Sequence, residues 1–191
     1  MKLYCATSNP GKLREFRLAA GPEFELVPLT GVPPCEETGS TFEANAVEKA
    51  VYYSGHAPGL LFAEDSGLEV DALGGAPGVR SARFAGENAS DQDNNRLLLE
   101  KLRGVTDRTA RYVCVIALAQ GEQPLATFRG EVAGRIIDEP RGTNGFGYDP
   151  YFFYEALGLT FAEISPEQKL QVSHRGRALA QTLAWLKERA S

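Results

Sequence analysis

Cysteine and histidine are scarce in this sequence, which has three cysteines and two histidines among 191 residues. The number of cysteines is odd, and no Cys-x-x-Cys pair or Cys/His cluster is present. These features argue against a disulfide framework and against a structural zinc site. Unpaired cysteines are typical of a reducing compartment, so we expect a cytoplasmic protein.

Long apolar runs and an excess of positive charge are also missing. No stretch is long enough to span a bilayer, and the first residues lack a basic segment followed by an apolar one, so we expect neither export nor membrane anchoring. The formal net charge is -5, from 20 Lys and Arg against 25 Asp and Glu. This balance argues against binding to a nucleic acid polymer, which depends on many cations at phosphates, but it is compatible with a small phosphorylated ligand.

The residues that are present predict a single mixed α/β domain over 1–191. The composition is 43% hydrophobic and 24% charged, as in an ordinary globular domain with a substantial core. Strand-like and helix-like apolar spacings alternate along the first half, and strands dominate the centre. Ser40 and Glu43 are expected to form a capping box. Strands are expected at 3–7, 24–29, 60–63, 68–73, 111–119, 125–137 and 148–153. Helices are expected at 10–20, 41–55, 91–102 and 178–186.

The segment 7–12 lies where the first strand gives way to the first helix. Free backbone amides and the positive end of the helix dipole meet there, and Lys12 adds a mobile charge, which predicts a phosphate-binding turn. The simpler interpretation is a helix capped by Asn9 with a lysine on its surface, and the spacing is not that of a Walker A loop. The candidate residues are Thr7, Ser8, Asn9, Pro10, Gly11 and Lys12.

Two neighbouring acids, Glu64 and Asp65, are expected at a strand end before a glycine-rich loop. Adjacent carboxylates repel each other unless a cation lies between them, although a hairpin with a solvated acidic tip would also fit. Magnesium prefers oxygen ligands and uses one or two carboxylates together with substrate phosphates. The candidate metal ligands are Glu36 and Asp65, provided that the fold brings the 31–39 loop close to Asp65. One acid could also deprotonate a water for attack on phosphorus.

Rings and glycines are concentrated in the segment 143–152. Phe146 or Tyr148 could stack on a flat base while Asp149 accepts hydrogen bonds, although a tight turn with core aromatics fits equally well. Downstream, His174 and Arg175 could donate to carbonyl oxygens or phosphates, or could simply begin the last helix as solvated cations. Together with the turn and the acids, these segments predict a nucleoside triphosphate site.

Seven motifs, in order along the chain, resemble those of the inosine/xanthosine triphosphate pyrophosphatases, a family that removes non-standard purine nucleotides. Seven matches in this order are not expected by chance. They are Thr-x-Asn-x-x-Lys from Thr7, Glu-Glu-Thr-Gly from Glu36, Thr-Phe-x-x-Asn-Ala-x-x-Lys-Ala from Thr41, Asp-Ser-Gly-Leu from Asp65, Leu-Gly-Gly-Ala-Pro-Gly from Leu73, Gly-Phe-Gly-Tyr-Asp-Pro from Gly145 and Ser-His-Arg-Gly from Ser173.

The resemblance implies a homodimer with a substrate cleft between two lobes of each mixed sheet. It implies Mg²⁺-dependent hydrolysis of ITP, dITP or XTP to the monophosphate and pyrophosphate, with Asp65 as proton acceptor and metal ligand and Glu36 as second ligand. Donors from His174 and Arg175 would satisfy a 6-keto oxygen but not the 6-amino group of adenine, so ATP should be a poor substrate. The implied substrate-binding residues, besides those of segment 7–12, are Ser66, Phe146, Gly147, Tyr148, Asp149, Lys169, His174 and Arg175.

Two other functions are compatible with the same residues. A nucleotide sensor would keep the pocket without hydrolysis, and a different nucleotide hydrolase would use altered contacts near Phe146 and His174. Glu64 replaces an aspartate that many relatives carry, and its role and that of Lys49 are left open. The sequence also leaves open the choice among ITP, dITP and XTP, the exclusion of GTP and the choice between Mg²⁺ and Mn²⁺.

Overall fold

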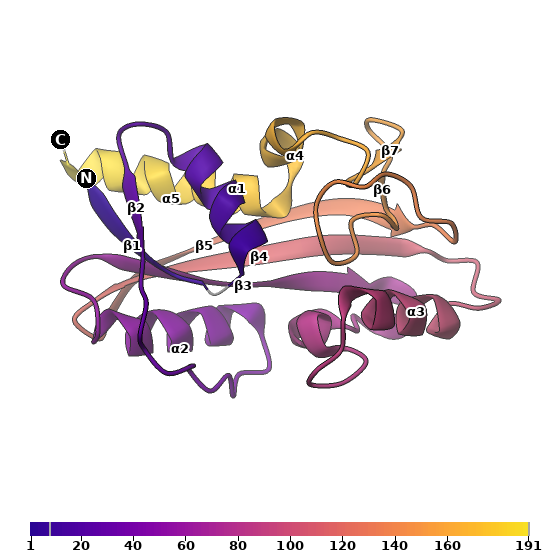
Figure 1. Cartoon of the computed structure of the whole chain (residues 1–191), viewed down its shortest axis with the longest axis horizontal. Coiled ribbons are helices and arrows are strands. Elements are labelled where there is room, and N and C mark those ends of the chain that lie inside the picture. Colours follow the sequence, from indigo (N-terminus) through magenta and orange to yellow (C-terminus); the bar gives the residue numbers. More distant parts are fainter. Residues whose placement is uncertain (8, 191) are drawn as a thin grey trace.

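The computed structural model describes residues 1–7 and 9–190, and within them a twisted seven-stranded sheet lies between two layers of helices (Figure 1). The strand order is β2-β1-β3-β4-β5-β6-β7; β1 is parallel to both β2 and β3, and the remaining pairs are antiparallel. The predicted α/β fold with a mixed sheet and flanking helices is confirmed. None of the helices in the described residues has the length and apolar character needed to cross a membrane.

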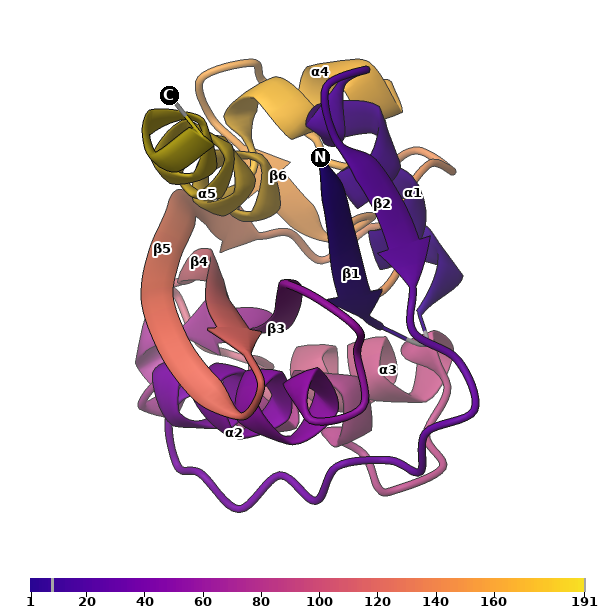
Figure 2. The same ribbon diagram turned by 90° about the vertical axis from the view of Figure 1, so that its left-hand side faces the viewer.

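The helices α1, α4 and α5 lie on one face of the sheet, and α2 and α3 lie on the other (Figures 1 and 2). The strands are β1 (Lys2–Ala6), β2 (Glu25–Pro28), β3 (Leu61–Val70), β4 (Thr109–Gln120), β5 (Gln123–Ile136), β6 (Phe152–Tyr154) and β7 (Leu159–Thr160). The helices are α1 (Pro10–Ala20), α2 (Phe42–Ser54), α3 (Asp91–Lys101), α4 (Pro166–Val172) and α5 (His174–Ala190), with short 3₁₀ turns η1 (Asp71–Leu73) and η2 (Gly78–Arg83).

The central strands are buried on both faces, which explains their continuous apolar runs. Because side chains alternate along a strand, Phe62 of β3 packs against Phe16 of α1, with ring centroids 4.9 Å apart. Its neighbours Leu61 and Ala63 pack on the opposite face with Ala46 of α2. The same alternation continues into the polar part of β3 and determines where its acids point.

The predicted break in the acidic segment is wrong. β3 runs without interruption from Leu61 to Val70, so Glu64 and Asp65 lie inside a strand and not at its end. Gly67 is typical of a turn, but here a Cβ atom at this position would lie 2.3 Å from Ser81 Oγ. The glycine is therefore needed because η2 packs directly against the strand.

The predicted capping box of α2 is also wrong. Thr41, and not Ser40, is the N-cap, since Thr41 Oγ1 accepts a hydrogen bond from Ala44 N at 3.1 Å. Glu43 instead forms an ion pair with Arg129 of β5 at 2.5 Å. Local spacing assigned the Glu43 side chain to the helix cap, but in the fold it binds Arg129, which is distant in sequence.

Two boundaries near the C-terminus differ from the prediction. The strand expected at 148–153 begins only at Phe152, because Tyr148 lies in a turn and donates its hydroxyl to Ser81 O at 2.7 Å. The last helix begins at His174, earlier than its apolar spacing indicated, and follows α4 directly. As a result, Tyr148 is fixed by a hydrogen bond to Ser81, and His174 and Arg175 lie in the first turn of a helix.

Candidate active site

The site lies along an edge of β3 that β1 leaves free. β1 pairs with β3 only as far as Ala6 and Ala63, and from Glu64 onward this edge of β3 has no partner strand among the described residues. The chain leaving β1 turns into α1 at the same place, so the N-terminus of a helix faces the carboxyl end of a parallel strand pair. This is where open α/β sheets bind ligands.

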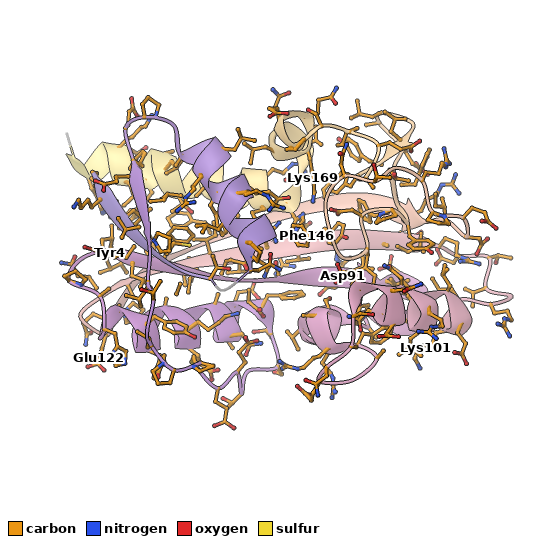
Figure 3. All side chains as sticks on the ribbon, viewed as in Figure 1. Tyr4, Asp91, Lys101, Glu122, Phe146 and Lys169 are labelled. Atoms are coloured by element: carbon orange, nitrogen blue, oxygen red, sulfur yellow. The ribbon has the colours of Figure 1, made fainter. Side chains whose placement is uncertain are left out.

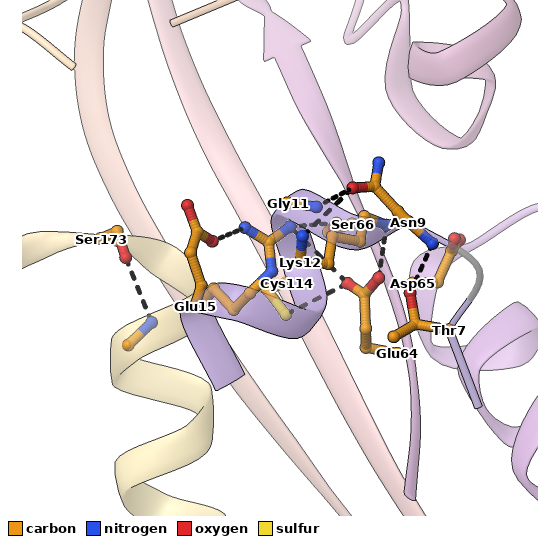
Figure 4. Close-up of polar contacts among 12 residues, drawn as sticks. Thr7, Asn9, Gly11, Lys12, Glu15, Glu64, Asp65, Ser66, Cys114 and Ser173 are labelled. Atoms are coloured by element: carbon orange, nitrogen blue, oxygen red, sulfur yellow. Dashed lines mark hydrogen bonds and ion pairs between the residues drawn. The ribbon is translucent and has the colours of Figure 1, made fainter. Parts of the chain in front are cut away.

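Asn9 organises the turn into α1 (Figure 4). Its Oδ1 accepts hydrogen bonds from the amides of Gly11 at 2.8 Å and Lys12 at 3.1 Å, and its own amide donates to Thr7 Oγ1 at 3.2 Å. Pro10 occupies the first helical position, as the sequence predicts. The predicted candidate Ser8 lies outside the described residues.

The two acids of β3 point to opposite faces of the sheet. Glu64 forms an ion pair with Lys12 on the α1 side and lies 3.9 Å from Arg175 Nη2. Cys114 Sγ lies 3.6 Å from the same carboxylate. Burial tends to raise the pKa of Glu64, but Lys12, Arg175 and Lys49 outweigh it and lower this pKa to about 2. Glu64 is therefore a charged partner for cations and not a proton acceptor at neutral pH.

Asp65 faces α2 and meets a different lysine. Its Oδ1 accepts from Lys49 Nζ at 2.9 Å and its Oδ2 from Asn45 Nδ2 at 3.1 Å. Lys49 Nζ also lies 3.4 Å from Glu37 Oε1. Burial is the largest influence on Asp65 and raises its pKa, although Lys49 opposes the shift. Unlike Glu64, Asp65 is thus shifted toward accepting a proton.

The aromatic and basic segments meet at the other end of the site. Asp149 Oδ2 accepts from Lys169 Nζ at 2.6 Å and from Phe146 N at 2.9 Å, and its Oδ1 lies 3.3 Å from the hydroxyl of Tyr112. Lys169 Nζ also lies 4.9 Å from the centroid of the Phe146 ring. Burial raises the pKa of Asp149, and Lys169 opposes this shift.

His174 and Arg175 are the first two residues of α5, and they line the same pocket as Asp149 and Lys169. The His174 ring stacks on Tyr112 with centroids 4.6 Å apart. Burial, followed by the charges of Arg175 and Lys169, lowers the pKa of His174 well below its usual value, so the ring is neutral at pH 7. Arg175 donates to Ser66 Oγ at 3.0 Å and pairs with Glu15. Burial opposes the charge of Arg175, but Glu15 and Glu64 raise its pKa above the usual value.

One pocket brings together most of the predicted substrate-binding residues from α1, β3, α4, α5 and the 143–149 loop. Thr7 and Pro10 do not line it, Gly11 lines a neighbouring cavity beside Phe146, and Asp65 lies next to Ser66 just beyond its wall. The predicted residues that line the pocket are Asn9, Lys12, Ser66, Phe146, Gly147, Tyr148, Asp149, Lys169, His174 and Arg175.

Among the described residues, Glu36 forms no hydrogen bond or ion pair with Asp65. Its side chain is exposed and lines a separate pocket with Arg80, whereas its neighbour Glu37 contacts Lys49 and through it Asp65. No group of three or more His, Cys, Asp or Glu side chains that could hold a metal is found in the described part of the chain. The carboxylate near Asp65 is that of Glu37, and Lys49 Nζ forms ion pairs with both.

Among the residues that sequence reasoning missed, Glu15 and Tyr112 support this pocket. Glu15 lies one helical turn beyond Lys12 and pairs with both Lys169 and Arg175, so helical spacing from Lys12 could have found it. Tyr112 lies in an apolar strand that gave no functional signal. Asn45 and Lys49 are four residues apart on α2 and so share a helix face, and the structure places both against Asp65.

Comparison with known proteins identifies the family. Residues 3–185 match the model of the Ham1 family. A dITP/XTP pyrophosphatase of Acidobacterium capsulatum is 51% identical over 97% of this chain and 98% of its own length, and one of Geobacter sulfurreducens is 50% identical over 94% and 93%. The Ham1 protein of Staphylococcus aureus has a TM-score of 0.89 at 42% identity, covering 99% of this chain and all of its own. The resemblance seen in the seven motifs is confirmed, and the chain belongs to the Ham1 family.

Proposed function

We propose that this protein hydrolyses non-standard purine nucleoside triphosphates, namely ITP, dITP and XTP, to the monophosphate and pyrophosphate. The observation that carries the proposal is the position of Asp65 in β3: its pKa is raised, and it directly precedes Ser66, which lines one pocket with Lys12 of α1 and Phe146. The similar proteins named dITP/XTP pyrophosphatase support the same substrate class.

Selection of the base follows from the donors in the pocket. Arg175 Nε is a buried donor with no partner among the described residues, and an oxygen at position 6 of a purine would supply one. Adenine carries an amino group there and would leave the donor unpaired. Because a buried unpaired donor costs about 1 to 3 kcal/mol, ATP should be disfavoured by about fivefold to 150-fold.

The phosphates would lie along the edge of β3. Lys12 and the first turn of α1 would bind them on one side, and Lys49 on the other. Asp65 would take the proton of the attacking water as the anhydride between the α- and β-phosphates breaks and pyrophosphate leaves. Lys49, 2.9 Å from Asp65, would hold that carboxylate in place before the reaction.

We include Mg²⁺ in the proposal because the donors fit it. Carboxylate oxygens are its preferred protein ligands, and Asn45 Oδ1, in the same cluster, is buried without a partner among the described residues. Asp65 would hold the ion together with Glu37, which replaces Glu36 because only Glu37 is linked to Asp65 through Lys49. When bound, the ion neutralises phosphate charge. A homodimer and a cytoplasmic location also remain part of the proposal.

The test is a substrate panel of ITP, dITP, XTP, GTP and ATP with Mg²⁺, in which pyrophosphate and phosphate are assayed separately. Pyrophosphate and monophosphate from ITP or XTP, with little from ATP, are expected. Asp65→Asn should lower kcat at least about a hundredfold and leave the circular dichroism spectrum unchanged. Tight ITP binding without products would indicate a nucleotide sensor, and release of phosphate and diphosphate would overturn the proposed bond cleavage.

A further inference from the structure

Phe146 lies between two glycines whose backbones are left-handed. Gly145 has a φ of +76° and Gly147 a φ of +64°, values that disfavour other residues. At Gly145 a Cβ atom would also lie 2.0 Å from Asp149 Oδ2. Such a glycine-rich loop would be mobile unless other contacts held it, so its contacts decide how well the Phe146 ring is positioned.

Two side chains of α3 hold the peptide groups of Gly147. Asp91 Oδ2 accepts from Gly147 N at 2.7 Å, and Asn95 Nδ2 donates to Gly147 O at 2.9 Å. Asp91 and Asn95 are four residues apart, so they lie one turn apart on the same helix face. Figure 3 shows Asp91 at the start of α3, with Phe146 and Lys169 lying toward the opposite helical layer. We call these two residues the α3 clamp.

The clamp and Asp149 together fix the backbone around Phe146. Asp149 Oδ2 accepts from Phe146 N at 2.9 Å, so both peptide groups that flank the Phe146 Cα are held by side chains. The ring itself is seated against α1, because a Cβ atom at Gly11 would lie 2.8 Å from Phe146 Cδ1. The aromatic platform is therefore ordered before any ligand arrives, which lowers the entropy cost of binding.

Asp91 is not needed to cap its own helix. Ser90 and Asp93 form a complete capping box at the start of α3. The Asp91 carboxylate is free to bind the loop instead, and it also lines the substrate pocket. Direct contact with substrate and indirect action through the loop are thus distinct possibilities that kinetics can separate.

We infer that Asp91 and Asn95 are positioning residues for the purine base and act through Phe146. The inference rests on the proposed function and extends it to a helix on the far side of the sheet from α1 and α5. The inference requires only that the base stacks on Phe146. The two residues should therefore matter equally for ITP, dITP and XTP.

The first test compares Asp91→Ala with Asp91→Asn. An asparagine retains an oxygen that accepts from Gly147 N, so it should keep KM for ITP close to that of the wild type. The alanine should raise KM about tenfold and change kcat less than about twofold, since it loosens the platform and leaves Asp65 in place. Asn95→Ala should reproduce the increase. Glu100→Ala is the matched control, because it removes an exposed acid from the same helix without touching the loop or the capping box.

The second test places Asp91→Ala in a Phe146→Ala background. If Asp91 acts through Phe146, the added substitution should change KM less than about twofold there. A tenfold rise in that background would overturn the inference in favour of direct contact. An unchanged KM in folded Asp91→Ala would overturn it as well.

Calorimetric binding of inosine monophosphate to each variant gives the same comparison without turnover. If wild-type protein binds this nucleotide but hydrolyses no triphosphate, the proposed function fails while the clamp is still tested by the binding constants. If wild-type protein binds no purine nucleotide, both fail. A rise in the dissociation constant for Asp91→Ala and Asn95→Ala, with Glu100→Ala unchanged, supports the clamp.

Discussion

Replacement of Glu15 by glutamine should destabilise the protein strongly, although Glu15 is not expected to contact substrate. Glu15 Oε1 accepts from Lys169 Nζ at 2.9 Å, and Oε2 pairs with Arg175. The three side chains are between 3% and 11% exposed. Burial tends to raise the pKa of Glu15, but Arg175 and Lys169 outweigh it and lower this pKa below its usual value.

The expected cost follows from what the two cations retain. Removing one partner of a buried ion pair costs about 3 to 5 kcal/mol. Lys169 keeps Asp149 at 2.6 Å and Arg175 keeps Ser66 at 3.0 Å, which places the cost at the lower end. For a domain of this size, about 3 kcal/mol corresponds to a fall in Tm of about 6 to 12 °C.

The pH dependence gives a second readout. A carboxylate with a lowered pKa contributes stability above its unfolded pKa of 4.5, and this contribution is lost as the pH falls through the folded value. The gap between wild type and Glu15→Gln should therefore be full at pH 7 and shrink below pH 4.5.

Urea and thermal unfolding at pH 7 and pH 4 measure this gap. Glu25→Gln is the matched control, because Glu25 forms an exposed pair with Lys2 at 3.9 Å that should contribute less than about 1 kcal/mol. Equal stability of Glu15→Gln and wild type at pH 7 would refute the reasoning, as would a gap that does not change with pH.

Three further outcomes are expected. His174→Gln should lose less stability than the wild type between pH 7 and pH 5 in urea unfolding, because the unfolded wild type takes up a proton that buried His174 resists. Gly11→Ala should raise KM for ITP about tenfold, since its methyl group would press on Phe146, with kcat little changed. Removing divalent cations with EDTA should weaken binding of a non-hydrolysable ITP analogue at least about tenfold in calorimetry and leave inosine binding unchanged, because only the analogue carries phosphates.

The parts of this fold that were predictable are those set by local chemistry. Asn9 and Pro10 mark the start of α1 because a side-chain acceptor and a missing amide suit the first turn of any helix. The long apolar run of β4 identifies a strand buried on both faces without knowledge of its neighbours. The grouping of Asn45 and Lys49 on one helix face also follows from spacing alone.

The parts that were not predictable depend on residues distant in sequence. Glycine is common in turns, but Gly67 lies within strand β3. It must be a glycine because Ser81 of η2 packs directly against it and leaves no room for a Cβ atom. Glu36 and Glu37 are equivalent acids in the sequence, and only the position of Lys49 on α2 distinguishes them. The aromatic sequence around Tyr148 predicts a strand, but Tyr148 lies in a turn, where its hydroxyl donates a hydrogen bond to Ser81 O. In each case a partner from another element decides the outcome.

The charges of the site bear on the proposed divalent cation. Four cationic side chains are already paired with five carboxylates, so the cluster itself carries a net charge of about -1 when all are ionised. The cations are Lys12, Lys49, Lys169 and Arg175, and the carboxylates are Glu15, Glu37, Glu64, Asp65 and Asp149. A highly charged anion would be repelled by this balance unless carboxylates were neutralised. Since Glu64 stays ionised well below neutral pH, the divalent cation proposed at Asp65 and Glu37 would supply the missing positive charge.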